Sequence, residues 1–166
     1  SVLLGQYGTT RSIQGNGIFS SNLASPFSYV SGSAQSGLLL IGAITTDATA
    51  TVLRSSGAAA GTTNQVILPN NSAYSFKATI IAGVTGAGNT ASWMVLGAIK
   101  RGATAASTAL VGAVTTTLIA QDAGASTWTI ALTADTTNGG LAVTVTGQAA
   151  TTIRWVCKIE TTEMTY

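Results

Sequence analysis

The sequence predicts an all-β protein, an antiparallel β-sandwich of jelly-roll-like type, and three observations support this fold class. Apolar and polar residues alternate with period two, which places successive side chains on opposite faces of a strand. Segments rich in Thr, Asp, Gly and Asn separate these runs at short intervals, as in sandwiches and barrels. No stretch carries a convincing helical stripe, and only ATAASTAL at 103–110 is expected to form a single helical turn.

Nine strands are expected from Leu38 onward. They cover residues 38–45, 50–54, 64–68, 74–84, 92–101, 109–119, 127–134, 141–147 and 152–161. The clearest pair is WTIALTADTTNGGLAVTVTG at 128–147, in which both halves alternate around a turn. Asn138-Gly139-Gly140 supplies the residues that tolerate positive φ in a tight reversal. This segment is therefore predicted to be a β-hairpin.

Two of the expected strands are apolar on both faces. LLLIGAI at 38–44 and WMVLGAI at 93–99 have no polar alternation, so each face of these strands needs a cover. In a single sandwich one face meets the core, and we expect the other to meet a neighbouring subunit. Only 7% of residues are charged, against about 25% in typical chains, which also favours a surface covered by copies of itself.

Residues 1–36 are predicted to form an extended arm, followed by a sandwich domain at 37–166. This segment is rich in Gly, Ser and Asn, and its apolar residues stand singly or in pairs, with no strand partner of their own. A disordered tail is the alternative, but such tails are poor in aromatic and aliphatic residues. The arm is therefore expected to attach the protein and interlock subunits through Ile18, Phe19, Phe27 and Tyr29.

Composition excludes several partners. A chain of 166 residues suits one domain with its own core. The net charge of +2 comes from seven basic and five acidic residues without a basic cluster, so no nucleic-acid partner is expected. No window reaches the 18 or so apolar residues of a membrane span, and the N-terminal SVLLGQYG lacks the basic region of a signal peptide.

Residue types limit the possible chemistry. The absence of histidine excludes Ser-His-Asp and Cys-His nucleophiles, and one cysteine cannot build a tetrahedral zinc site. Cys157 falls in the alternation of Ile153, Trp155 and Ile159, which predicts a buried core thiol. No cofactor, metal or catalytic residue is expected.

Paired carboxylates are the remaining enzymatic option, as in glycoside hydrolysis. The candidates are Asp47, Asp122, Asp135, Glu160 and Glu163. Asp47 and Asp135 lie in the Thr-rich segments TTDAT and TADTTNG, where an Asp commonly caps its own turn. The sequence therefore predicts that the protein is not an enzyme.

Four segments carry a resemblance to a known family. They are TTDATATVL at 45–53, TTNQVILPNNSAYSFKATIIA at 62–82, LTADTTNGGLAVTVTG at 132–147 and IRWVCKIETTEM at 153–164. In order and spacing over roughly residues 37–166, the chain resembles a β-rich domain of bacteriophage virion proteins, best known as the C-terminal module of tail-fibre and tailspike-like chains. The resemblance implies a place in the virion after assembly in the host bacterial cytoplasm, a homotrimer and no catalytic role.

Two functions follow as expectations. In the first, a homotrimeric tip of tail-fibre or receptor-binding type recognises a bacterial surface glycan. Candidate glycan contacts are Asn70, Asn71, Tyr74, Trp128, Asp135 and Asn138. In the second, a head decoration (cement) protein binds and stabilises the capsid through residues 1–36. The expected partners are copies of the chain itself and tail or major capsid proteins of the virion.

Overall fold

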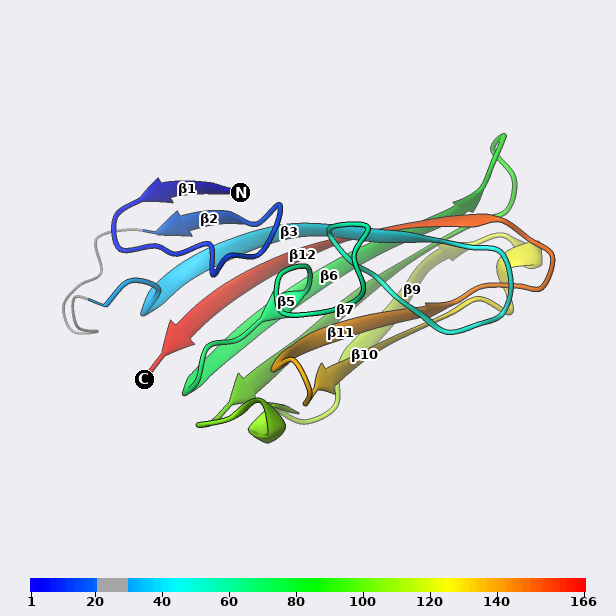
Figure 1. The fold of residues 1–166 in the computed structure, drawn as a ribbon. Coiled ribbons are helices and arrows are strands. Elements are labelled where there is room, and N and C mark those ends of the chain that lie inside the picture. Colours follow the sequence, from blue (N-terminus) through cyan, green and yellow to red (C-terminus); the bar gives the residue numbers. More distant parts are fainter. Residues whose placement is uncertain (21–29) are drawn as a thin grey trace.

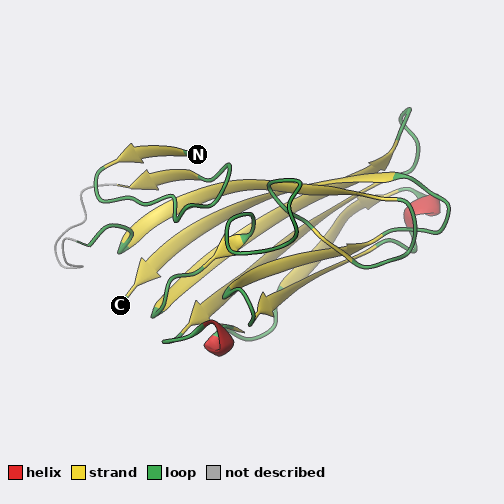
Figure 2. Ribbon diagram, in the orientation of Figure 1, coloured by secondary structure: helices red, strands yellow, loops and turns green. Residues whose placement is uncertain are grey.

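The computed structural model describes residues 1–20 and 30–166 and shows two β-sheets packed face to face (Figures 1 and 2). The predicted all-β sandwich is therefore confirmed. In the described part of the chain the only helices are two single 3-10 turns, Ala105–Ser107 and Ala123–Ala125. Among these same residues, no helix has the length and apolar character needed to cross a membrane.

The larger sheet holds eight strands, and β12 lies at its centre between β3 and β6 (Figure 1). The order is β1-β2-β3-β12-β6-β7, after which β8 and β9 both pair with β7. All pairs are antiparallel except β1 with β2, which is parallel. The strands are β1 (Val2–Gly5), β2 (Gly17–Ser20), β3 (Ala34–Thr45), β6 (Ser72–Val84), β7 (Thr90–Arg101), β8 (Ala109–Leu110), β9 (Thr115–Gln121) and β12 (Ile153–Thr165).

The smaller sheet covers one face of the larger one. Its strands are β10 (Thr129–Asp135), β11 (Gly140–Thr146), β4 (Thr51–Val52) and β5 (Val66–Ile67). β10 and β11 form the predicted hairpin, in register from Thr129↔Thr146 to Asp135↔Gly140. Of the three residues expected to supply positive φ in its turn, Gly139 alone does so, with φ +78°.

Three tryptophans pack together in the core between the sheets. The ring of Trp155 lies 5.9 Å from that of Trp93 and 5.8 Å from that of Trp128, measured between centroids. The indole Nε1 of Trp155 donates to Oγ1 of Thr45 at 2.9 Å, so its one polar group is satisfied. The inward alternation of Trp155 and Cys157 expected from the sequence is confirmed, and Trp128 is buried as well.

The strand predicted at 109–119 is broken in the structure. Gly112 adopts φ +75°, outside the range of a strand, and separates β8 from β9. β8 pairs with β7 at Ile99 and Lys100, and β9 pairs with the N-terminal half of β7, at Ala91–Leu96. A run of strand-forming residues does not reveal such a break because glycine fits both conformations.

The N-terminal segment contains strands, so the prediction that Ile18 and Phe19 have no strand partner is wrong. Ile18 pairs with Gly37 and Phe19 with Ser36, which adds β2 to the edge of the larger sheet. Ile18 is buried against its own chain, whereas Phe19 points away from the core and is 63% exposed. The two other residues expected in the arm, Phe27 and Tyr29, lie outside the described residues.

The face of the larger sheet that points away from the smaller sheet is unusually apolar. We call this face the outer face, and nine of its exposed large apolar residues the outer patch. The outer patch consists of Val2, Leu4, Phe19, Leu38, Leu40, Ile44, Ile81, Leu96 and Val156. The doubly apolar run at 38–44 thus buries Leu39 and Ile41 in the core and leaves alternate residues on the outer face.

Candidate functional site

A cleft lies at one end of the sandwich, where the N-terminal segment meets the connection between β5 and β6 and the end of β7. We call it the rim cleft; its volume is about 530 Å³. It is lined by Thr9, Arg11, Ser31, Ile67, Leu68, Pro69, Asn70 and Arg101. The lining combines two guanidinium groups, hydroxyl groups and an exposed amide with the apolar residues Ile67, Leu68 and Pro69, so the residues behind it decide what the cleft can bind.

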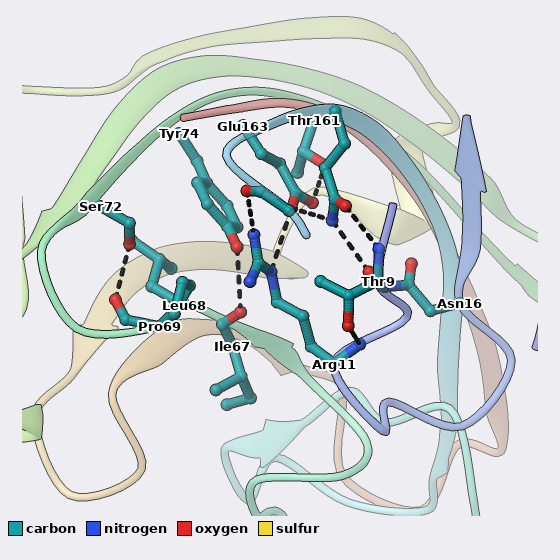
Figure 3. Close-up of polar contacts among 12 residues, drawn as sticks. Thr9, Arg11, Asn16, Ile67, Leu68, Pro69, Ser72, Tyr74, Thr161 and Glu163 are labelled. Carbon is teal, nitrogen blue, oxygen red and sulfur yellow. Dashed lines mark hydrogen bonds and ion pairs between the residues drawn. The ribbon is translucent and has the colours of Figure 1, made fainter. Parts of the chain in front are cut away.

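Arg11 is held in a buried polar network behind the cleft (Figure 3). Its Nε lies 3.3 Å from Oε2 of Glu163, and its Nη2 donates to the carbonyl oxygen of Gly32 at 3.0 Å. Gln35 Nε2 donates to the same Glu163 oxygen at 2.7 Å, and Thr161 Oγ1 donates to the other at 2.8 Å. The Glu163 carboxylate is therefore fully engaged, and it fastens residues 9–11 to β3 and β12.

Tyr74 lies in the same network, with the Arg11 guanidinium 5.8 Å from the centre of its ring (Figure 3). Its hydroxyl donates to the Ile67 carbonyl oxygen at 3.4 Å. Burial, reinforced by the nearby Glu163 carboxylate, raises the pKa of Tyr74 far above its usual value, so the phenol stays protonated. Because the ring is only 2% exposed, Tyr74 offers no open surface on which a sugar can stack.

Arg101 ends β7 and is positioned by two neighbouring loops. Its Nη1 donates to the carbonyl oxygen of Leu68 at 2.6 Å and lies 3.5 Å from that of Gly139. A Cβ atom at position 139 would fall 2.2 Å from this Nη1, so the β10–β11 turn approaches the guanidinium closely only because it carries glycine. The hairpin turn thus fixes the guanidinium at the cleft.

The structure separates the six residues predicted to contact a glycan. Asn70 lines the cleft and is exposed. Its neighbour Asn71 has φ +54°; its backbone N–H donates to the carbonyl oxygen of Gly102, and its carbonyl oxygen accepts from the N–H of Tyr166. Trp128 lies in the core beside Gln148, away from the cleft, with its ring 3% exposed.

Asp135 and Asn138 build the β10–β11 turn instead of a binding surface. Asp135 accepts hydrogen bonds from the backbone of Thr137 and from Asn138 and Gln65, at 2.7–3.2 Å. Partial burial alone would raise the pKa of Asp135, but these hydrogen bonds outweigh it and lower the pKa below its ordinary value. Both residues therefore act on the cleft only through Gly139, which contacts Arg101.

The other carboxylates considered as catalytic candidates also support turns or strands. Asp47 Oδ1 accepts from the backbone N–H of Thr49 at 2.7 Å, which confirms the predicted self-capped turn. Asp122 Oδ2 accepts from the backbone N–H of Thr90 at 2.8 Å. Within residues 1–20 and 30–166, no group of three or more His, Cys, Asp or Glu is placed to hold a metal ion.

Sequence reasoning missed the two arginines of the cleft. Arg11 and Arg101 stand alone in the sequence, and no local pattern indicates that they line one cleft. A signal did exist for Glu163, because it continues the inward set of β12 that includes Ile159 and Thr161. A charged residue at an inward position needs a buried partner, and that requirement points to an arginine.

Comparison with known proteins gives one distant similarity. The sequence matches no family model and no curated protein. The structure is similar to the tailspike protein gp49 of the Acinetobacter baumannii bacteriophage Fri1, with a TM-score of 0.45 and 12% sequence identity. The similarity covers 79% of this chain and 18% of the tailspike chain, so the matched region is a small part of that protein.

The comparison corrects one prediction. The Fri1 tailspike is a capsular polysaccharide depolymerase, which is an enzyme, and this contradicts the prediction that the present chain is not one. That prediction rested on the missing histidine and on carboxylates that cap turns. It is withdrawn.

Proposed function

We propose that this chain is the β-sandwich module of a bacteriophage virion protein, of tail-fibre or receptor-binding type, that forms a homotrimer through its outer face. The observation that carries the proposal is the outer patch, which leaves nine large apolar side chains at the surface of a single chain. Its three β3 members, Leu38, Leu40 and Ile44, are 45–60% exposed. Isolated chains rarely expose many large apolar side chains on one face, and such faces commonly mark contacts between proteins.

A second copy of the chain is the partner that fits this face best. Burying a large apolar side chain gains about 1.5–3 kcal/mol, so several members of the patch together exceed the entropic cost of association. The outer face also carries Lys77, Lys100, Arg154, Lys158 and Glu160, and the last two pair at 3.4 Å. The chain as a whole has little charge to keep copies apart.

Recognition of the host surface is assigned to the rim cleft. Clefts with a few converging polar groups are where ligands usually bind. The cleft lies at an end of the sandwich, whereas the outer patch covers a face, so one region can bind copies while the other stays open. The virion role itself rests on the resemblance of residues 37–166 to phage tail-fibre and tailspike modules.

A second candidate function is head decoration. Val2, Leu4 and Phe19 favour it, because they are exposed apolar residues on β1 and β2, within the segment expected to attach to a particle. Antibody labelling of intact virions separates the candidates by position. Label at the tail supports the receptor-binding function, and label spread over the head supports decoration.

The trimer is tested by light scattering of the full chain. The expected mass is about three times the 16.6 kDa of one chain. Leu40→Asp places a charge in the outer patch and should give folded monomers, whereas Thr62→Asp, on an exposed turn, should leave the mass unchanged. A monomer at micromolar concentration for the unchanged protein would contradict the proposal.

A further inference from the structure

The Arg101 guanidinium has hydrogen-bond donors without acceptors. Its Nε is buried and has no partner among the described residues. The bonds that it does make, to Leu68 and Gly139, use Nη1. A buried donor without an acceptor is unfavourable, and such a group in a native fold calls for a partner, for which a water or a bound ion can serve.

The two arginines of the cleft differ in charge balance. The Arg11 guanidinium is neutralised by Glu163, which Gln35 and Thr161 hold in place. Arg101 forms no ion pair with any residue of the ranges 1–20 and 30–166, since the two ion pairs found there are Arg11–Glu163 and Lys158–Glu160. The cleft therefore carries one positive charge that the chain does not balance.

We propose that the rim cleft binds an anionic group of a polysaccharide, a carboxylate or a phosphate, through Arg101. The Nη2 group makes no hydrogen bond to the described residues and can donate to an oxygen of such a group, and a charge-assisted hydrogen bond of this kind is stronger than a neutral one. Leu68 and the Gly139 turn fix the guanidinium in advance, which lowers the entropic cost of binding. This inference rests on the proposed host-recognition function and specifies its ligand class.

The other groups of the lining suit the neighbouring sugar. Asn70 is exposed at the edge of the cleft, and Thr9 and Ser31 add hydroxyl groups that donate to or accept from sugar hydroxyls. Ile67, Leu68 and Pro69 give the cleft an apolar side against which a sugar ring can pack. In this arrangement the anionic group binds Arg101, and these residues contact the rest of the saccharide.

Calorimetry with three probes tests the proposal on the full-length chain. The probes are tetragalacturonate, its carboxyl-reduced neutral counterpart, and a glycerol-phosphate oligomer of matched length. We expect at least one anionic probe to bind and the neutral one to bind at least tenfold more weakly. The anionic probe that binds more tightly identifies the preferred group as a carboxylate or a phosphate. Added salt should weaken the binding of that probe.

Two variants address the cleft by different routes. Arg101→Gln removes the charge, and Asn70→Asp adds a repelling charge at an exposed position whose side chain supports no other residue in the described structure. Both variants should bind the anionic probe about tenfold more weakly, or weaker still. The controls are Arg54→Gln, whose guanidinium also donates to a backbone carbonyl oxygen, and Asn89→Asp in the exposed β6–β7 loop. Both controls should bind as the unchanged protein does.

Asn70→Asp keeps the proposal testable if Arg101→Gln disturbs folding. Equal binding by Asn70→Asp and Asn89→Asp would overturn it, as would failure of both anionic probes to bind at about 1 mM. Binding of the unchanged protein to host cells is measured in parallel. If the protein binds cells but the cleft variants bind equally well, the ligand assignment fails and host recognition stands. If neither cells nor probes are bound, the proposed function fails as well.

Discussion

The two faces of the larger sheet carry similar residues and meet opposite environments. Trp155 and Val156 are neighbours on β12, yet the first is 1% exposed and the second 48%. On β3 the same holds for Leu39, which is buried, and Leu40, which is 59% exposed. Side chains alternate between the two faces along a strand. The smaller sheet therefore covers the inward side chains of the larger sheet and leaves the outward side chains exposed.

The comparison shows that apolar character alone does not identify the core of this protein. The inner face stabilises a single chain, whereas the outer face stabilises an assembly once copies cover it. The two contributions differ in a measurable way, because only the second depends on chain concentration. Ion pairs follow the same division, with Arg11–Glu163 buried on the inner side and Lys158–Glu160 exposed on the outer face.

The largest effect is expected from Trp155, whose ring contacts both other core tryptophans. Trp155→Ala should lower the free energy of unfolding by about 3–5 kcal/mol, as large aromatic truncations in cores do. Val156→Ala, one residue further, should cost less than about 0.5 kcal/mol in dilute, monomeric protein. Urea unfolding at two chain concentrations checks both values. Only for Val156→Ala is the loss of unfolding free energy expected to depend on chain concentration. The same dependence for Trp155→Ala would reverse the assignment of the inner and outer faces.

The buried ion pair should rank second. Arg11→Met leaves the Glu163 carboxylate buried without its counter-charge and should cost about 3 kcal/mol, because removal of one partner strands the other. The matched change on the outer face, Lys158→Met, breaks a pair whose side chains are both 44% exposed and should cost less than about 1 kcal/mol.

A double variant distinguishes the stranded charge from lost packing. Combining Arg11→Met with Glu163→Gln removes both charges and should recover part of the loss, as measured by urea unfolding. The double variant could instead be less stable than Arg11→Met by as much as Glu163→Gln alone destabilises the unchanged protein. In that case Arg11 contributes through packing on Tyr74 and not through charge balance.

The sequence allows most of the fold to be predicted from residue 38 onward, because long strands repeat the alternation enough times to fix their register. β12 is the clearest case, since Ile153, Trp155, Cys157 and Ile159 all lie inward as expected. β1 and β2 escape this reasoning because each has four residues, too few for a recognisable pattern. Their strand character comes from pairing with the exposed edge of β3, which is a tertiary contact.

The candidate site was predictable only in part. Asn70 was named from the sequence as a candidate glycan contact, and the structure places it at the cleft. The positions of the two arginines could not be predicted. Arg11 is separated from its partner Glu163 by 152 positions in the sequence, and Arg101 is separated from Leu68 by 33. Trp128 and Tyr74 were candidates for glycan contact because aromatic rings often contact sugars, but both side chains are buried in the core between the sheets.

The smallest effect concerns Cys157, a thiol on the inner face beside exposed residues of the same strand. Burial raises the pKa of Cys157 to about 12, from 9.0 for a free thiol. The folded state therefore keeps the proton more strongly than the unfolded state. This contribution to stability is complete below pH 9.0 and is lost as the pH rises toward about 12.

Cys157→Ala removes that dependence and serves as the reference protein. Between about pH 8 and about pH 10, the unchanged protein should lose about 1 kcal/mol more of its unfolding free energy than Cys157→Ala does. Other groups titrate equally in both proteins, so the difference between the two losses reports the thiol alone. Parallel losses would mean that the thiol ionises as freely in the folded protein as in the unfolded chain, which requires water to reach the inner face of β12. Such access would abolish the contrast between Cys157 and its exposed neighbours on the outer face, and with it the reason for treating the two faces differently.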